Sequence, residues 1–332
     1  MDPLQLLYQD LNERLRAFQE SRVLLSAIEL DLFTAVGQGG TAVEAAAKLG
    51  TDARATEMLL NALVALDLLT KREGVFRNTP LAARYLLHGS PGYARPALMH
   101  AVHLWDRWST LTACVRAGAP VTRDQIQDRG DEWIEAFIAA MHANAIVRAP
   151  QVVKAVGTEG VERLLDVGGG SGAYSIAFAQ ARPSLHAEVL DLPAVLKIAP
   201  GHIARAGLSD RVTTRPGDLR TDPLGQGCDL VFISAICHML GPEENQDLLK
   251  RSFEALAPGG RIVVQDFILE SDKTAPRQAA LFSLNMLTGT EHGSSYSQPE
   301  YAAWLGAAGF TGLRRIRLEG PSELMIGTRP KT

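Results

Sequence analysis

Hydrophobic residues follow a helical spacing through most of the first 150 residues. Four leucines between positions 4 and 15 recur every three or four residues, which places them on one face of a helix. Thr41 and Glu44 form a capping-box pattern that starts a helix, and Gly50 marks its expected end. A second helix is predicted over 54–66, with apolar residues on one face.

A short hairpin is predicted after these two helices. The runs 68–70 and 75–77 flank a turn at 71–74, so helix, turn, helix and hairpin together make a winged-helix pattern. Such a unit either binds DNA through its second helix or packs against protein. Residues 41–80 hold five basic and five acidic residues, and the second helix is largely apolar. This balance favours a packing or dimerisation module over a DNA-binding one.

From residue 160 onward the pattern changes to strands that alternate with helices. It predicts strands at 163–167, 188–192, 211–214, 230–234 and 261–267, and helices at 171–181, 193–206 and 242–256. Such alternation is typical of right-handed βαβ units in a mostly parallel sheet. The last two runs, 313–318 and 323–328, are joined by a tight turn and must therefore be antiparallel.

These patterns predict an α/β protein with two domains. We expect a mainly helical winged-helix domain over residues 1–150. It should be followed over 151–332 by a Rossmann-like, doubly wound sheet, mostly parallel with an antiparallel last strand. A chain of 332 residues is long enough for two such domains.

Composition narrows the functional classes. The chain is 46% hydrophobic and 21% charged, an ordinary globular balance that excludes a disordered or fibrous protein. Its net charge of −4 disfavours nucleic acid as the main partner. We find no apolar stretch of membrane-spanning length and no signal-peptide pattern. The three cysteines lack disulfide-framework or zinc spacing, so we expect a cytoplasmic protein without a bound metal.

A glycine-rich loop follows the first predicted strand, in the stretch Asp166-Val-Gly-Gly-Gly-Ser-Gly172. Glycines between a strand and a helix let the backbone approach a ligand closely. The spacing also fits a relaxed dinucleotide fingerprint, so a nicotinamide-dependent oxidoreductase is one alternative. Asp166 argues against a phosphate here, because its carboxylate would repel the phosphate but can accept hydrogen bonds from an ammonium group.

Asp191 ends the second predicted strand, and Asp218 lies in the segment that closes the third. Asp191 is placed to accept hydrogen bonds from ribose hydroxyls, and Asp218 to accept one from an adenine amino group, with Leu219 packed on the ring. An ammonium group, a ribose and an adenine without phosphate describe S-adenosylmethionine. The predicted cofactor-binding residues are Asp166, Gly168, Gly170, Asp191, Leu192, Gly217, Asp218, Leu219 and Ser234.

In this order the motifs resemble the class I S-adenosylmethionine-dependent small-molecule O-methyltransferases, which include plant caffeate enzymes and bacterial hydroxyneurosporene and polyketide enzymes. The likeness covers almost the whole chain and includes Ile236-Cys-His238, Pro258-Gly-Gly-Arg261 and Ala308-Gly-Phe310. It implies methyl transfer to a hydroxyl, with S-adenosylhomocysteine as product. It also implies that Ile28-Glu-Leu-Asp-Leu-Phe33 and the winged helix form a dimerisation domain, and hence a homodimer.

His238 follows the fourth predicted strand, at the sheet edge where ligands lie in open α/β folds. Methylation of a phenol or enol requires loss of its proton, and an imidazole, whose ordinary pKa is about 6.5, is suited to accept that proton. The resemblance implies that His238 is the general base and that Asp266, at the end of the fifth strand, orients it. A second family carboxylate maps near 294–295, where this chain has serines, with Glu291 and His292 as neighbouring replacements.

Four residues are predicted to contact the acceptor: Met141, Asn144, Asn285 and Met286. The resemblance places them on helices that border the cofactor cleft. Methionines with a few polar groups suit a flat, largely apolar molecule, so we expect an aromatic or polyketide-like hydroxyl compound of secondary metabolism. Two alternatives stay open at this point. The same fold and cofactor can serve carbon methylation, decarboxylation, hydroxylation or ring closure, and a winged helix is also compatible with a ligand-sensing regulator.

Overall fold

The chain forms two compact units in the computed structural model, which describes residues 3–122 and 130–331. The first unit comprises Met1–Trp105 and Glu135–Ala140, and the second comprises Asp106–Ile134 and Met141–Thr332. Helix α9 (Asp131–Val156) runs through residue 150, where the sequence predicts the domain boundary, and contributes residues to both units. The division between the units at Trp105 also falls within a helix, Arg95–Ser109, so no single linker separates them.

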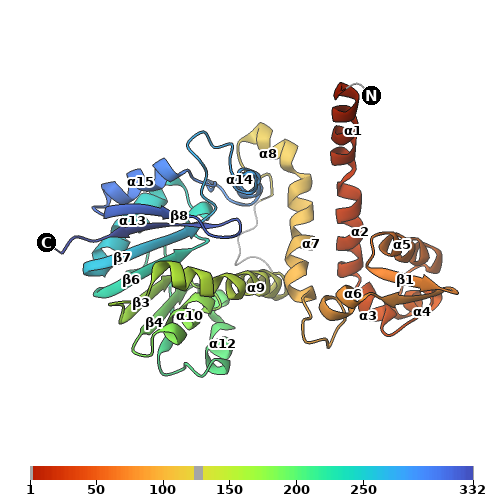
Figure 1. The fold of residues 1–332 in the computed structure, drawn as a ribbon, viewed down its shortest axis with the longest axis horizontal. Helices are drawn as coiled ribbons and strands as arrows, with labels where there is room; N and C mark the ends of the chain where they lie inside the picture. Colours follow the sequence, from red (N-terminus) through yellow and green to blue (C-terminus); the bar gives the residue numbers. More distant parts are fainter. Residues whose placement is uncertain (1–2, 123–129, 332) are drawn as a thin grey trace. The chain divides into compact units, whose positions relative to one another are not determined.

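Within residues 3–105, the first unit is helical apart from one hairpin (Figure 1). Its elements are α1 (Pro3–Arg16), α2 (Phe18–Glu29), α3 (Leu32–Val36), α4 (Ala42–Leu49), α5 (Ala53–Ala65), β1 (Leu69–Arg72), β2 (Val75–Asn78), α6 (Pro80–Tyr85) and most of α7 (Arg95–Ser109). As predicted, Thr41 and Glu44 form a capping box and α4 ends at Gly50, whose φ is 66°. β1 and β2 pair antiparallel, which confirms the winged-helix pattern.

A hydrophobic core joins the hairpin of the first unit to its helices. Phe33, Leu60, Leu63, Leu69 and Phe76 are each at most 2% exposed. Burying one such side chain contributes about 1.5–3 kcal/mol to the stability of the fold. These residues come from α3, α5 and both strands, so core packing as well as strand pairing holds the hairpin in place.

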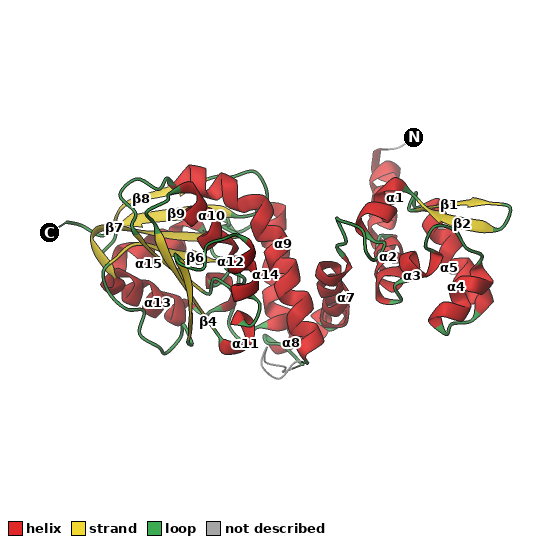
Figure 2. Cartoon of the chain, turned by 90° about the horizontal axis from the view of Figure 1, so that it is seen from below, coloured by secondary structure: helices red, strands yellow, loops and turns green. Residues whose placement is uncertain are grey.

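In the described part of the chain, the second unit is built on a seven-stranded sheet (Figures 1 and 2). Its strands are β3 (Arg163–Val167), β4 (His186–Asp191), β5 (Val212–Pro216), β6 (Cys228–Ser234), β7 (Leu256–Asp266), β8 (Thr311–Ile316) and β9 (Glu323–Thr328). Their order is β5-β4-β3-β6-β7-β9-β8, with β9 antiparallel to both neighbours and the other pairs parallel. The predicted Rossmann-like, mostly parallel α/β fold with an antiparallel last strand is confirmed, and this strand, β9, lies between β7 and the edge strand β8.

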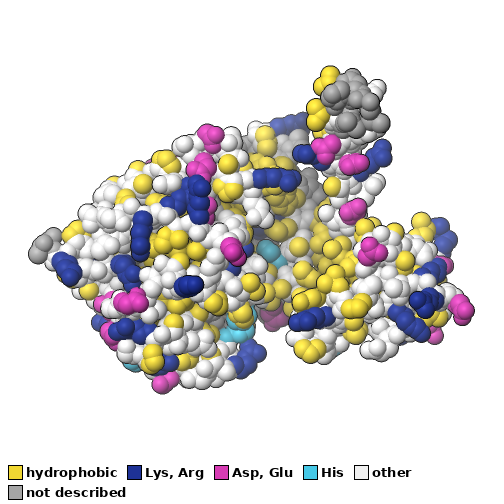
Figure 3. Space-filling view, in the orientation of Figure 1, with side chains coloured by type: hydrophobic (Ala, Val, Ile, Leu, Met, Phe, Trp, Pro, Cys, Tyr) yellow, Lys and Arg dark blue, Asp and Glu magenta, His cyan; other side chains and the backbone are white. Residues whose placement is uncertain are grey.

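Helices cover both faces of this sheet. One face packs against α9, α10 (Ala173–Ala181), α11 (Pro193–Leu196) and α12 (Ala199–Arg205), and the other against α13 (Pro242–Ala255) and α15 (Gln298–Ala307). The unit also contains α8 (Leu111–Ala117) and α14 (Arg277–Gly289). No helix among the described residues is both long and apolar enough to cross a membrane. On the face that Figure 3 shows, acidic and basic side chains lie interspersed, as is ordinary for a globular surface.

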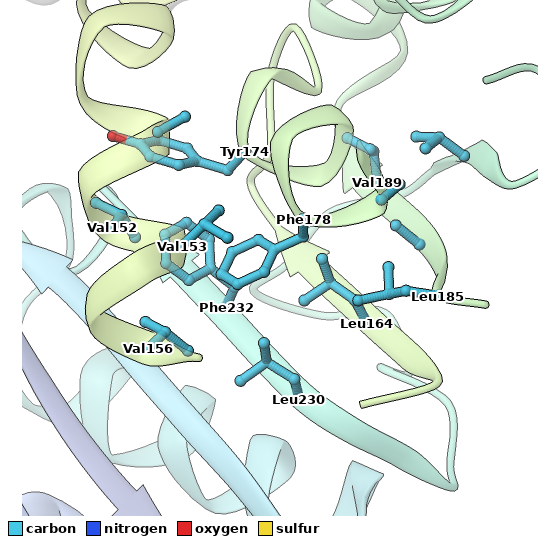
Figure 4. Close-up of a cluster of buried hydrophobic side chains, with 14 of the residues drawn as sticks. Val152, Val153, Val156, Leu164, Tyr174, Phe178, Leu185, Val189, Leu230 and Phe232 are labelled. Atoms are coloured by element: carbon cyan, nitrogen blue, oxygen red, sulfur yellow. The ribbon is translucent and has the colours of Figure 1, made fainter. Parts of the chain in front are cut away.

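The core between the sheet and α9 fixes the position of that helix. Val152, Val153 and Val156 of α9 lie against the aromatic rings of Phe178 and Phe232 (Figure 4). The rings of Phe178 and Phe232 meet edge-on at 5.6 Å. Because these side chains are at most 9% exposed, the half of α9 in the second unit is anchored to the sheet.

Several predicted elements differ from the structure in their bounds, and β7 begins at Leu256, five residues before the predicted start at 261. The helix expected over 193–206 is broken into α11 and α12, because Pro200 has no N–H to continue the first helix and instead lies in the first turn of the second. The strand expected at 313–318 lies two residues earlier, at Thr311–Ile316, in a register that pairs Ile316 with Leu324 of β9. Pairing with β9, and not the pattern of the strand's own residues, sets this boundary.

Candidate active site

The glycine-rich loop joins β3 to α10 at the carboxyl end of the sheet. Gly168, Gly170 and Gly172 have φ values of 70°, 56° and 74°, a left-handed backbone that favours glycine. A Cβ on Gly168 would also lie only 2.3 Å from Ile236 Cδ1, in the segment after β6. Glycine is therefore required here both by the backbone conformation and by the close packing of two loops.

Asp166 in β3, just before this loop, is completely buried. Its Oδ2 accepts a hydrogen bond of 2.7 Å from the Ser175 hydroxyl on α10, whereas Oδ1 has no hydrogen-bond partner among the described residues. Burial raises the pKa of this carboxyl to about 7; the bond from Ser175 opposes the rise and the negative charge of Asp191 adds to it. A buried acceptor without a partner suits a ligand that brings a cation or a donor.

Asp191 ends β4, the neighbour of β3 in the sheet. Its Oδ2 accepts the Gly170 N–H at 2.8 Å, and its Oδ1 accepts the Leu192 N–H at 2.7 Å. Burial raises the pKa of Asp191 to about 6, although both hydrogen bonds oppose the rise. The carboxylate is therefore held against the glycine loop.

The segment Gly217–Leu219 follows β5 and approaches the same loop. A Cβ on Gly168 would lie 3.4 Å from the Leu219 Cδ2, and the Asp218 Oδ1 accepts the Arg220 N–H at 2.9 Å. Ser234, at the end of β6, donates from its hydroxyl to Gln265 Oε1 at 3.3 Å. The residues predicted to bind the cofactor thus come from the carboxyl ends of four neighbouring strands.

His238 lies in a short 3₁₀ turn, Cys237–Met239, just after β6. Its Nδ1 is 2.6 Å from Asp266 Oδ1 at the end of β7, and its backbone N–H donates to Asp266 Oδ2 at 3.0 Å. β6 and β7 are parallel neighbours, so their carboxyl ends bring the two side chains together. With Nδ1 donating to the carboxylate, Nε2 is the ring nitrogen that can exchange a proton with a ligand.

Further donors hold Asp266 in its buried position. The Tyr301 hydroxyl of α15 donates to Oδ2 at 3.1 Å, and the Phe267 N–H donates to Oδ1 at 2.8 Å. Each carboxylate oxygen thus has two donors, which offsets the cost of burying the charge. Sequence reasoning missed Tyr301. The one local signal for it is its place four residues after Ser297, where a capping box starts α15.

Two phenylalanines border the imidazole of His238. The Phe282 ring on α14 meets it edge-on at 4.8 Å, and the Phe267 ring lies 6.0 Å away. The two phenylalanine rings stack on each other at 3.9 Å, with an interplanar angle of 19°. Aromatic side chains beside a titratable imidazole suit proton exchange with a flat, apolar ligand.

Comparison with known proteins agrees with this geometry. Residues 117–311 match the O-methyltransferase domain, and residues 13–88 match the O-methyltransferase dimerisation domain. The chain belongs to the O-methyltransferase family. This assignment removes the oxidoreductase alternative, and it identifies the winged helix as part of a dimerisation domain.

Individual relatives of this O-methyltransferase cover nearly all of its length. It is 37% identical over 308 residues to the 3-hydroxy-5-methyl-1-naphthoate 3-O-methyltransferase of Streptomyces sahachiroi, covering 91% of this chain and 89% of the relative. It is 32% identical over 333 residues, 97% of each chain, to the tetracenomycin polyketide synthesis 8-O-methyl transferase of Streptomyces glaucescens. The structure of human N-acetylserotonin methyltransferase in complex with S-adenosylmethionine is similar, with a TM-score of 0.85 and 26% identity over 98% of both chains.

The O-methyltransferase uses S-adenosylmethionine as its cofactor, and the residues at the sheet edge fit that molecule. Asp166 Oδ1 would accept from its ammonium group, because this buried oxygen has no hydrogen-bond partner within the described residues. Asp191 would accept from the ribose hydroxyls beside the glycine loop. Asp218 and Leu219 would contact the adenine.

The predicted acceptor contacts of the O-methyltransferase lie on two helices. On α14, Asn285 Oδ1 accepts an indole N–H from α7 at 3.0 Å, and Met286 is only 7% exposed. On α9, Met141 is half-buried and Asn144 is exposed. Met286 follows Phe282 by one helical turn, so α14 presents it near the ring that meets His238.

Serines fill the segment where the family resemblance implies a second carboxylate. The Ser283 and Ser294 hydroxyls are 3.3 Å apart, and the Ser295 N–H donates to Ser283 Oγ at 3.0 Å. Glu291 and His292, the neighbouring candidates, are both exposed. In this O-methyltransferase the carboxylate in contact with His238 is therefore Asp266.

We expect Asp191→Ala to weaken binding of S-adenosylhomocysteine by about 1–3 kcal/mol, because buried ribose hydroxyls lose their acceptor. Titration calorimetry measures this directly. Asp210→Ala, which removes an exposed carboxylate of the same unit, is the matched control and should leave the Kd unchanged. An unchanged Kd for Asp191→Ala as well would place Asp191 outside the cofactor site.

Proposed function

We propose that this O-methyltransferase methylates a phenolic or enolic hydroxyl of a small aromatic or polyketide-like acceptor, with His238 as general base. The observation that carries the proposal is the 2.6 Å contact between His238 Nδ1 and Asp266 Oδ1. This contact favours the tautomer in which Nε2 is unprotonated, so Nε2 can take the proton of the acceptor. Asp266 then balances the positive charge that develops on the imidazole.

Bound S-adenosylmethionine supplies an electrophilic methyl group on a sulfonium, a chemistry that protein side chains lack. The acceptor oxygen forms its bond to the methyl carbon as the carbon–sulfur bond breaks, and the hydroxyl proton passes to Nε2 and then to solvent. Holding the two reactants in line should supply most of the rate. Proton removal by His238 should add a factor of about 10²–10⁴.

The acceptor class is supported by the side chains near His238. The stacked rings of Phe267 and Phe282 beside His238 would give the acceptor an apolar lining, to which the buried Met286 would add, and Asn285 would supply one polar group. The relative from Streptomyces sahachiroi is named for a hydroxynaphthoate. The side chains near His238 and the name of this relative together favour, as acceptor, a flat ring system that carries a hydroxyl, of the kind found in secondary metabolism.

A crystal structure with S-adenosylhomocysteine and 3-hydroxy-2-naphthoate, used as a hydroxyarene probe, tests this proposal. We expect the probe hydroxyl within hydrogen-bond distance of His238 Nε2 and the ring system against Phe282. A bound probe whose hydroxyl points away from His238 would contradict the general-base role.

We also propose a homodimer formed through the first unit, which matches the dimerisation domain. Helix α1 exposes large apolar side chains at helical spacing, each more than half exposed: Leu4, Leu7, Tyr8, Leu11 and Leu15. Contiguous exposed apolar side chains of this kind mark an interaction surface. An obligate dimer interface buries above about 2,000 Å².

We therefore expect light scattering at micromolar concentration to give the mass of two chains. Leu11→Glu puts a charge among the apolar side chains of α1 and should shift the mass toward a single chain. Val115→Glu changes an exposed apolar residue on α8, in the second unit and outside the dimerisation domain, and serves as the control, with the dimer mass retained. A single-chain mass for the wild-type protein would contradict the proposed homodimer.

We further propose that the protein works in a reducing compartment such as the cytoplasm. Cys114, Cys228 and Cys237 support this, because all three are buried free thiols. Burial also raises the pKa of the Cys228 and Cys237 thiols, which keeps them protonated and unreactive.

A further inference from the structure

A histidine on α9 contacts the cofactor loop, and neither the cofactor nor the acceptor assignment accounts for it. His142 Nδ1 lies 2.8 Å from the hydroxyl of Ser171, which is 6% exposed and sits between Gly170 and Gly172. This is a hydrogen bond from a helix to the loop that must hold the cofactor. The helix itself is anchored to the sheet by its buried valines.

A second histidine supports the first. The imidazole of His202, on α12, lies against that of His142 in a tilted arrangement, with ring centroids 3.7 Å apart and an interplanar angle of 37°. Arg205, one turn further along α12, places its guanidinium 3.1 Å from His202 Nδ1. His202 of α12 therefore packs against one face of the His142 ring, while the Ser171 hydroxyl forms a hydrogen bond with Nδ1 at the ring edge.

Both imidazoles are neutral under physiological conditions. Burial, together with electrostatic repulsion from His202 and Arg205, lowers the pKa of His142 to about 4. Burial and Arg205 also lower the pKa of His202. A neutral His142 keeps its hydrogen bond to Ser171 unchanged between pH 6 and 9.

We propose that His142 is a positioning residue that holds the cofactor loop in its binding conformation, with His202 as its support. The proposal rests on the assignment of this loop to S-adenosylmethionine. Because Met141 precedes His142 directly and Asn144 follows two residues later, the same bond joins the helix predicted to contact the acceptor to the cofactor loop.

A double-mutant cycle with S-adenosylhomocysteine tests the link. We expect His142→Ala and Ser171→Ala each to raise the Kd about 3- to 10-fold in titration calorimetry, since each removes one hydrogen bond. The double variant should be no weaker than the weaker single variant, because both changes break the same bond. His186→Ala, at an exposed histidine in β4, is the control and should leave the Kd unchanged.

Conservative variants separate positioning from general packing. In His142→Asn the side-chain amide stands where Nδ1 stands, so the Kd should return to within about twofold of wild type. His142→Gln places its amide near the Nε2 position and should not rescue binding. His202→Ala should weaken binding of S-adenosylhomocysteine less than His142→Ala does, because it removes only the ring that packs against His142 and leaves the hydrogen bond to Ser171 in place. Thermal unfolding of each variant identifies any general loss of the fold.

The pH dependence gives an independent readout. The ratio of the Kd of His142→Ala to that of wild type should be constant from pH 6 to 9, because His142 does not titrate there. Additive losses in the double-mutant cycle, or equal Kd values for the Asn and Gln variants, would overturn the positioning role. Failure of the wild-type protein to bind S-adenosylhomocysteine would instead contradict the cofactor site itself.

Discussion

His238→Ala is expected to lower turnover of a phenolic acceptor by about 10²-fold or more while leaving the Kd for S-adenosylhomocysteine unchanged. The reason is that Nε2 of His238 is the base for the acceptor proton, whereas the cofactor contacts lie at the ends of β3, β4 and β5. Asp266→Asn should lower turnover less than His238→Ala does. Its amide oxygen can still accept from Nδ1, but it no longer balances the charge of the protonated imidazole.

The pH profile of turnover distinguishes a base from a structural residue. The loss in His238→Ala should shrink at high pH, because an acceptor that is already ionised needs no base. His292→Ala removes an exposed histidine of the segment that carries the serine cluster and is the matched control, with turnover close to wild type. Parallel pH profiles with equal rates for wild type and His238→Ala would show that positioning alone drives transfer.

Binding of S-adenosylhomocysteine is expected to strengthen as the pH rises from 5 to 8. Burial holds the pKa of Asp166 at about 7 in the free protein, so below that pH the carboxyl is protonated and must release a proton to face the ammonium group. Each pH unit below about 6 should therefore cost up to about tenfold in affinity. Calorimetry in buffers of different ionisation enthalpy should detect the released proton.

Asp166→Asn provides the control for this dependence. It should bind more weakly at pH 8 but lose most of the pH dependence, leaving the part due to Asp191, whose pKa is about 6. Adenosine lacks the ammonium group, so Asp166 should contribute little to its Kd for the wild-type protein. A wild-type Kd that does not change between pH 5 and 8 would contradict the raised pKa.

Asp166 gives the stability of the ligand-free protein the opposite pH dependence: stability falls as the pH rises, whereas binding strengthens. The folded protein keeps a proton on Asp166 up to about pH 7, whereas the unfolded chain releases it near its ordinary pKa of 3.8. The stabilisation is therefore complete below about pH 4 and is lost as the pH rises through 7. Thermal unfolding of wild type and Asp166→Asn between pH 4 and 8 should show this difference.

Much of the sheet could be predicted from local sequence because its strands are buried on both faces. The predicted bounds of β3 match the structure, since the apolar residues Leu164, Leu165 and Val167 lie just before the glycine loop. The mostly parallel pairing also follows from the alternation of strands and helices. The order of the strands comes from the structure, where the parallel neighbours β6 and β7 bring His238 and Asp266 together at their carboxyl ends.

The remaining features depend on contacts between distant residues. Tyr301 reaches Asp266 across 35 positions, and Ser171 meets His142 across 29, so no local pattern indicates either bond. The apolar residues on α14 are as consistent with helix packing as with acceptor contact, because both need the same side chains. The position of β8 could not be predicted from its own residues either, because its pairing with β9 sets where it begins and ends.

Transfer of a trideuteromethyl group tests the central claim most directly. The protein would be incubated with S-adenosylmethionine labelled at its methyl group and with a panel of hydroxynaphthoates, and the products analysed by mass spectrometry and NMR. We predict that at least one acceptor gains a single labelled methyl group on its hydroxyl oxygen, with an equal amount of S-adenosylhomocysteine formed. Label on a ring carbon, or consumption of the acceptor without methyl transfer, would contradict methylation of oxygen by this chain.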